Sequence, residues 1–249
     1  ISLLMFDTRN EYDKGVNTFS REGRLLQVEN AMKAVQKGTS AVGIKVNDGV
    51  VLSVHRKLNS KLIEPKSIQK VVEIDSHIAS AASGIVTDAK TIVEYARVEA
   101  QNHKFTYAEP IEIKSLTRSI CDLALHFGEG DPTSKKKPMS RPFGVALLIG
   151  GIDSTGPCLY HADPTGTMLK YTARGIGPAE ESITLELESS YRADMSLKET
   201  EKLALLCLKK NMEEDIESLN VELVTIPKST RQVEFKNEEY VAALLKELP

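Results

Sequence analysis

The spacing of hydrophobic residues changes between a helical and a strand period several times along the chain. Near its beginning, four hydrophobic residues recur at helical spacing: Leu25, Val28, Met32 and Val35. They predict a helix over 21–37, with Ser20 as its N-cap and Gly38 as its C-cap. Residues 1–20 show little periodicity, and we expect them to form an arm without a core of its own.

The next segment has the alternating pattern of strands. Residues 41–46 and 50–54 alternate around the turn Asn47-Asp48-Gly49, which predicts a β-hairpin. A second pair of strands is predicted at 70–75 and 78–83. Short connections of this kind join antiparallel strands.

Helical periodicity then returns in two long segments. Helices are predicted at about 85–100 and 116–127, separated by Pro110. The stretch 128–142 contains two glycines, three prolines and Lys135-Lys136-Lys137, which is the composition of a solvated loop.

The last third of the chain repeats this order of strands followed by helices. Strands are predicted at 143–149 and 157–163, joined by a glycine-rich loop over 150–156, and a further strand is predicted at 167–173. Two helices are predicted next, one at about 179–191 and one that begins after Ser196, where Ser196 and Glu199 form a capping box. A strand at 221–226 and a helix ending near Leu248 complete the chain.

Two blocks of antiparallel strands, each followed by a pair of helices, predict an α+β protein with helices outside two stacked sheets, a four-layer αββα sandwich. No stretch of the chain resembles a linker between domains. We therefore expect a single domain over 1–249, comprising the arm at 1–20, the helix at 21–37 and the sandwich at 38–249.

Composition narrows the classes of function. The chain has 32 basic and 35 acidic residues, a formal net charge of -3, so it lacks the positive field that binds a phosphate backbone, and we expect no nucleic-acid partner. No hydrophobic run approaches the roughly 20 residues of a membrane span, so we expect no membrane partner.

The side chains that bind metals and cofactors show no suitable pattern. Cys121, Cys158 and Cys207 form no CxxC pair, which favours buried reduced thiols and a reducing compartment. The histidines have no metal-binding i, i+4 spacing, and the glycines of 150–156 precede a strand and not a helix, which excludes a dinucleotide loop. We therefore expect neither a metal nor a cofactor.

Three segments resemble the α-type subunits of the 20S proteasome, most closely the α5 type: "EYDKGVNTFSREGRLLQVENA" at 11–31, "SGIVTDAKTIVEYARVEAQNH" at 83–103 and "MSRPFGVALLIGGID" at 139–153. The resemblance extends over nearly the whole chain. It implies the N-terminal-nucleophile hydrolase fold, which agrees with the layers predicted from the pattern. It also implies a non-catalytic subunit in ubiquitin-dependent protein degradation, in the cytoplasm and the nucleus.

The resemblance places Thr39 where the proteolytic β-type relatives carry their N-terminal threonine. That chemistry needs a free α-amine, because an unperturbed hydroxyl is a poor nucleophile. Here the predicted helix precedes Thr39, and His55 stands where the active relatives have an aspartate. We therefore predict no catalytic residue. The alternative is a threonine peptidase processed at Thr39, with Lys70 in the position of the catalytic lysine.

The resemblance gives Lys70 another role. In α-type rings the equivalent lysine lies in a pocket between subunits and pairs with the C-terminal carboxylate of activator tails, and Gly38 is expected to line the same pocket. The alternative is that Lys70 only neutralises Glu73 or Asp75.

The arm resembles the segment that gates the pore of the ring. Its open-state cluster would include Tyr12 and Asp13, but Arg21 replaces the usual proline and Asn30 the usual tyrosine. Without the proline, the backbone at position 21 loses a fixed φ angle, and without the tyrosine, position 30 loses a phenolic hydrogen-bond donor. Either other contacts support the open arm, or neighbouring subunits carry the cluster.

The expected partners are the other α subunits of a seven-membered ring, the β-ring subunits, and the tails of regulatory-particle ATPases or other activators. The apolar face of helix 21–37, which has no sheet to cover in the simple sandwich, is expected to contact neighbouring subunits. A free-standing monomeric binding protein on the same fold is a further alternative. Lys135-Lys136-Lys137 is interpreted as part of a solvated loop, with a nuclear localisation signal as the alternative.

Overall fold

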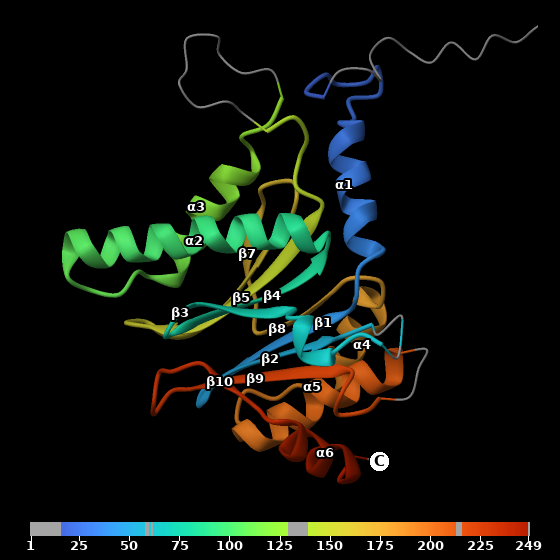
Figure 1. Ribbon diagram of the computed structural model, residues 1–249, viewed down its shortest axis with the longest axis vertical. Helices are drawn as coiled ribbons and strands as arrows, with labels where there is room; N and C mark the ends of the chain where they lie inside the picture. Colours follow the sequence, from blue (N-terminus) through green and yellow to red (C-terminus); the bar gives the residue numbers. More distant parts are fainter. Residues whose placement is uncertain (1–15, 58–59, 61, 129–138, 213–215, 249) are drawn as a thin grey trace, which may run out of the picture.

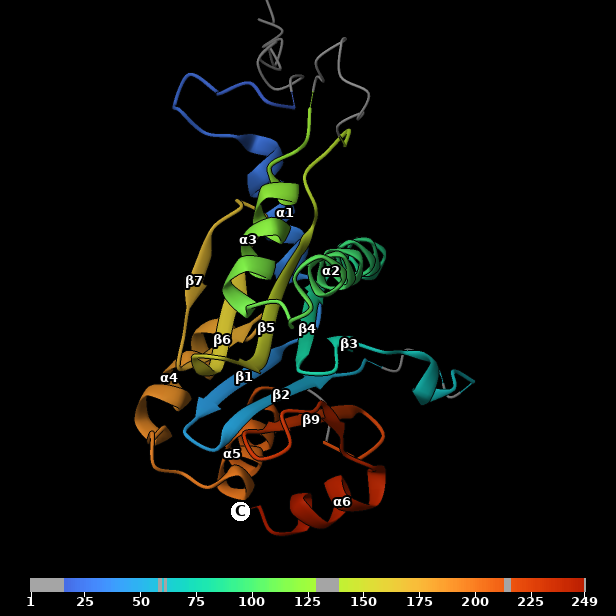
Figure 2. The ribbon, with the colours of Figure 1, turned by 90° about the vertical axis from the view of Figure 1, so that its left-hand side faces the viewer.

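The computed structural model describes residues 16–57, 60, 62–128, 139–212 and 216–248. In this part of the chain two five-stranded antiparallel sheets lie face to face, with helices on both outer sides (Figures 1 and 2). The predicted α+β sandwich is therefore confirmed. Tyr12, Asp13 and Lys135-Lys136-Lys137 lie outside the described residues.

The first sheet, called sheet A, has the strand order β10-β9-β2-β1-β8. Its strands are β1 Ala41–Val46, β2 Gly49–His55, β8 Ala173–Ile176, β9 Val221–Pro227 and β10 Glu234–Phe235. The second, sheet B, has the order β3-β4-β5-β6-β7. Its strands are β3 Val71–Asp75, β4 Ile78–Gly84, β5 Val145–Asp153, β6 Gly156–Ala162 and β7 Met168–Lys170.

The helices divide between the two outer faces. Sheet B is covered by α2 Val86–Tyr107 and α3 Ile113–Ala124, and sheet A by α4 Glu180–Ser190, α5 Leu197–Asn211 and α6 Glu238–Lys246 (Figure 2). Each of the three interlayer spaces holds its own hydrophobic cluster. A short 3₁₀ helix, Pro65–Ser67, precedes β3.

The first helix is shorter than predicted. It is α1, Leu26–Gln36, because Ser20 forms a separate turn in which its Oγ accepts a hydrogen bond from the amide of Arg24 (3.1 Å). Leu25 is the N-cap and Lys37 the C-cap, so the capping roles predicted for Ser20 and Gly38 are wrong.

The apolar face of α1 is not left wholly to neighbouring subunits. Ala31 and Val35 are buried against the sandwich, and Val35 belongs to the cluster between the sheets. Ser83 Oγ donates a hydrogen bond to Val35 O (3.2 Å). The C-terminal half of α1 is thus anchored on its own domain, and the expectation that it covers no sheet is wrong.

Two predicted boundaries between strands differ from the structure. The glycine-rich loop is confined to Ser154-Thr155, because Gly150 and Gly151 lie inside β5, where a Cβ at Gly150 would approach Val50 Cγ1 to 2.8 Å. The strand predicted at 167–173 is two strands, because the chain passes from sheet B to sheet A at 171–172.

Candidate functional site

Thr39 lies between α1 and β1, beside the end of β2. The amide of His55 donates to Ser40 O (3.0 Å), so Thr39 and His55 are neighbours at the open end of the predicted hairpin. Both line a pocket of about 400 Å³, together with Lys37, Lys57 and Asn211. The structure thus brings these two predicted residues together.

The nitrogen of Thr39 is a peptide nitrogen that continues into α1, so no α-amine is available as a base. The hydroxyl is buried, with 7% of the residue exposed, and among the described residues its Oγ1 has no hydrogen-bond partner. A hydroxyl that is hydrogen-bonded to no base, His55 included, is not activated as a nucleophile. The geometry of this pocket therefore does not support hydrolysis.

Gly38 is fixed by a close approach of two backbone segments. A Cβ at this position would lie 2.3 Å from the amide nitrogen of Gly84 and 2.8 Å from Ser83 Oγ. Any larger residue would push α1 and β1 away from the end of β4. Gly38 therefore lets the chain upstream of Thr39 pack against Ser83 and Gly84 at the end of β4.

Lys70 lies at the start of the edge strand β3, in a groove between β3, β4 and the first half of α2. The groove has a volume of about 320 Å³ and combines apolar walls with charged side chains; its lining includes Val72, Ala82, Val86, Ala89, Val93, Lys70, Lys90, Glu94 and Arg97. Gly84 also lines it. Gly38 and Thr39 line the other pocket, so no pocket found in the described chain contains Lys70 together with either of them.

The carboxylate that acts on Lys70 is neither Glu73 nor Asp75. Burial lowers the pKa of the Lys70 ammonium below its ordinary value, and the negative charge of Glu222 raises it in part. Asp75 lies 3.6 Å from His77 Nδ1 instead. Glu222, on β9 of sheet A, was missed in the sequence because it is 152 residues away from Lys70.

An ion pair fixes the start of α2, the helix that forms one side of the Lys70 groove. Arg141 donates to both carboxylate oxygens of Asp88 (2.7 and 2.9 Å), and the amide of Gly144 donates to Oδ2 (2.9 Å). Burial would raise the pKa of Asp88, but these bonds outweigh it and hold the pKa below its ordinary value. The segment before β5 is thereby tied to α2.

Two residues that were predicted to belong to the gate, Arg21 and Asn30, lie apart from both pockets. Arg21 is exposed in the turn before α1, and Asn30 is exposed on α1 beside a hollow of about 200 Å³ that Ile85 and Arg141 also line. Their side chains are not brought together with Lys70 or Gly38.

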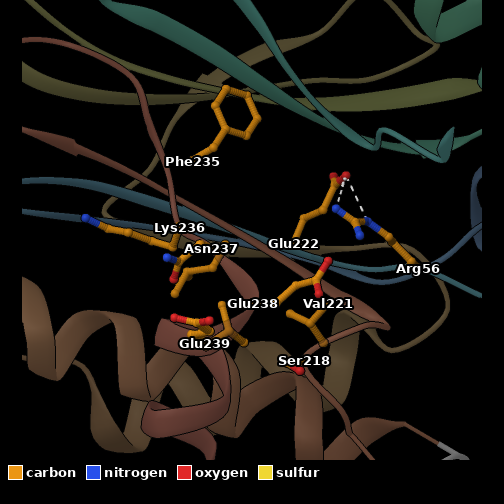
Figure 3. A pocket seen from close by; sticks show the side chains of 11 residues that line it. Arg56, Ser218, Val221, Glu222, Phe235, Lys236, Asn237, Glu238 and Glu239 are labelled. Atoms are coloured by element: carbon orange, nitrogen blue, oxygen red, sulfur yellow. Dashed lines mark hydrogen bonds and ion pairs between the residues drawn. The ribbon is translucent and has the colours of Figure 1, made fainter. Parts of the chain in front are cut away.

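A further pocket, of about 440 Å³, lies between β9, β10 and the start of α6 (Figure 3). Arg56 and Glu222 are paired on its wall, and Phe235, which is 53% exposed, stands at one side. Nothing in the sequence pattern indicated this pocket, since its residues come from three separate segments of the sequence.

The described residues contain no helix able to cross a membrane and no cluster of three or more His, Cys, Asp or Glu side chains suited to a metal. These findings concern only the described part of the chain. Cys121, Cys158 and Cys207 are all buried free thiols, as predicted.

Comparison with known proteins gives matches over almost the whole chain. The family described as "Proteasome subunit" matches residues 35–226, and the N-terminal signature of the A class of proteasome subunits matches 12–34. The chain is 51% identical over 243 residues to the "Probable proteasome subunit alpha type-5" of Schizosaccharomyces pombe, covering 98% of each chain. It is 50% identical to "Proteasome subunit alpha type-5" of Dictyostelium discoideum, over 98% of this chain and 100% of that one. Identity to the alpha type-5 subunit of Trypanosoma brucei brucei is 42%, over 97% of each.

Proposed function

The chain belongs to the proteasome subunit family, as a non-catalytic α-type subunit of the 20S core particle, and we propose that its Lys70 groove receives the C-terminal carboxylate of an activator chain. The observation that carries the proposal is the half-buried lysine at the end of an otherwise largely apolar groove.

The chemistry of the groove suits the end of a polypeptide. A compact ammonium accepts a carboxylate from a range of angles, and partial burial strengthens the pair relative to an exposed one. Val72, Ala82 and Val93 offer an apolar wall for the last side chains of a tail. Lys90 and Arg97 add positive charge, although Arg97 also bonds Glu94 (2.8 Å).

The groove opens beside β3, an edge strand of sheet B. Edge strands are places where a second chain can pack. We therefore place the neighbouring α subunit of a seven-membered ring along this edge, so that the complete docking pocket forms between two subunits. Gly38 belongs to the pocket in this proposal only if the neighbour or the tail reaches the other side of Gly84.

The remaining parts of the proposal follow from the same family. The arm before α1, with Tyr12 and Asp13, contributes to the axial gate, and Arg21 and Asn30 require supporting contacts other than those of the usual proline and tyrosine. The β-ring subunits are the second set of partners, and the cytoplasm and nucleus are the compartments. The whole of 1–249 acts as one domain.

The test is a Lys70→Ala variant incorporated into the assembled particle. We expect native size to be unchanged and binding of a peptide from an activator tail to fall at least tenfold, because the carboxylate loses its charged partner. Lys37→Ala is the matched control, because Lys37 is an exposed lysine that lines the Thr39 pocket. Equal affinity for both variants would contradict the proposal.

A further inference from the structure

We infer that Glu222 is the positioning residue for Lys70: a buried carboxylate on sheet A fixes the backbone from which the Lys70 side chain extends beside sheet B. The biological meaning of this role rests on the proposed docking function of Lys70. The contacts between the two residues do not depend on that function.

Hydrogen bonds from one sheet to the other hold the backbone at Lys70. Glu222 is 5% exposed, and its Oε2 accepts hydrogen bonds from the backbone amides of Lys70 (2.8 Å) and Val71 (2.6 Å). On the other side, the carbonyl of Lys70 accepts a bond from the amide of Ala82 on β4 (3.2 Å). The backbone of Lys70 is therefore held both by its own sheet and by a side chain of the opposite one.

Glu222 is itself held in place by Arg56. Its Oε1 accepts from Arg56 Nε (2.9 Å) and lies 2.7 Å from Arg56 Nη2, and the two side chains meet on the wall of the pocket in Figure 3. The amide of Arg56 donates to Asn220 O (2.7 Å). A carboxylate can satisfy both sets of donors because each oxygen accepts two bonds, whereas a glutamine would present an NH₂ group to one of them.

Charged groups on α2 also face Lys70. These are Lys90, Glu94 and Arg97, and β4 contributes no titratable side chain to the groove. Glu94 is bonded to Arg97. Glu222 opposes the effect of burial on the Lys70 ammonium. The same residue thus fixes the position of Lys70 and favours its charged form.

The experiment uses the assembled particle with Glu222→Gln in this subunit. The rate at which an N-hydroxysuccinimide ester acetylates Lys70 is measured by peptide mass spectrometry between pH 7 and 10, because only the neutral amine reacts. Binding of an activator-tail peptide is measured at pH 7. Glu239→Gln is the control, since Glu239 lines the same pocket as Glu222 but lies on α6, outside the Lys70 groove.

Loss of the Glu222 charge should move the acetylation profile to lower pH, because the ammonium loses the negative charge that favours it. Loss of positioning should weaken peptide binding about tenfold. If Arg56, left without a partner, prevents assembly, the double variant Arg56→Gln, Glu222→Gln removes that buried charge and should move the profile in the same direction.

A profile equal to that of Glu239→Gln, in particles of native size, would overturn the inference. The docking proposal fails separately: if Lys70→Ala leaves peptide binding unchanged while Glu222→Gln still moves the acetylation profile, Glu222 positions a lysine that has no docking role.

Discussion

The Thr39 pocket and the Lys70 groove lie on either side of the end of β4. They differ in whether the chain itself occupies the place where a functional group would act. In the first, Gly38 packs against Gly84 and the chain continues upstream into α1, so the place of a free amine is taken by a peptide bond. In the second, charged side chains face a hollow that no described segment fills.

The difference shows which parts of a hydrolase fold depend on chain processing. Thr39 and His55 lie side by side, but the chain continues upstream of Thr39, and no base among the described residues is hydrogen-bonded to its hydroxyl. A lysine needs no such base in order to bind a carboxylate. Binding therefore remains possible beside a site where the chemistry has been lost.

The largest effect is expected where Gly38 packs against Gly84 beside the Thr39 pocket. Gly38→Val would place a Cβ 2.3 Å from the nitrogen of Gly84, and neither backbone segment can yield easily. We expect a loss of about 3 kcal/mol in the free energy of unfolding, measured with urea. Gly23→Ala is the control: nothing lies within 4 Å of its Cβ, and its φ of +75° should cost only about 1 kcal/mol. Equal losses would show that Gly38 is not a packing position.

The second prediction concerns Asp88, whose bonds hold the start of α2 beside the Lys70 groove. Asp88→Asn weakens the bonds from Arg141 and Gly144, and we expect a loss of about 2 kcal/mol near neutral pH. Because the folded pKa of Asp88 lies below the unfolded value, its stabilisation is present at neutral pH and disappears as the pH falls through the folded pKa.

The pH dependence of that variant gives an independent check. The free energies of unfolding of wild type and Asp88→Asn should converge as the pH is lowered below the ordinary range of carboxyl groups. A difference that stays constant in acid would mean that Asp88 acts through its shape and not through its charge.

A smaller effect concerns the hydroxyl of Thr39. Thr39→Val replaces a buried hydroxyl, which has no partner among the described residues, by a methyl group of similar size. We expect stability to be unchanged or raised by up to about 1 kcal/mol, and the peptidase activity of the particle to be unchanged. A loss of activity in fully assembled particles would restore Thr39 as a functional hydroxyl.

The smallest expected effect is a pH response beside the crossing between the two sheets. His161 lies on β6, and its ring meets that of Tyr171 edge-on at 6.1 Å, where the chain crosses to sheet A. Burial lowers the pKa of His161; Asp163 raises it and Arg174 lowers it further. The unfolded chain therefore binds a proton at higher pH than the folded one does, so stability should fall as the pH drops from about 6.5.

His161→Gln should make this slope shallower in thermal unfolding measured between pH 7 and 5. A slope identical to that of the wild type would show that another group titrates. The variant should leave the Lys70 groove unaffected, because His161 lies on the opposite half of sheet B.

The sequence predicted most of the fold because its signals were local. The β-hairpin around Asn47-Asp48 and the capping box at Ser196 both depend on a few neighbouring residues, and the structure confirms both, with Gly49 already in β2. The start of α1 was wrong because Ser20 caps a turn and not the helix. The break at 171–172 was missed because a change of sheet leaves no mark on the alternation of side chains.

The candidate site could be predicted only in part for the same reason. Thr39 and His55 were singled out through the family resemblance, and the structure places them side by side at the open end of the hairpin. Glu222 was not found as a neighbour of Lys70, since it reaches Lys70 only after the two sheets have stacked; the alternative interpretation named only Glu73 and Asp75 on the strand of Lys70 itself. Contacts between sheets depend on packing, and no single-sequence period encodes them.

Whether this subunit is non-catalytic can be decided from the intact mass of the chain in purified particles, combined with sequencing of its N-terminal peptide. We predict that the residues of α1 and Gly38 remain covalently attached to Thr39. A chain that begins at Thr39 would have a free α-amine at that residue, and this result would contradict the conclusion that the subunit is non-catalytic.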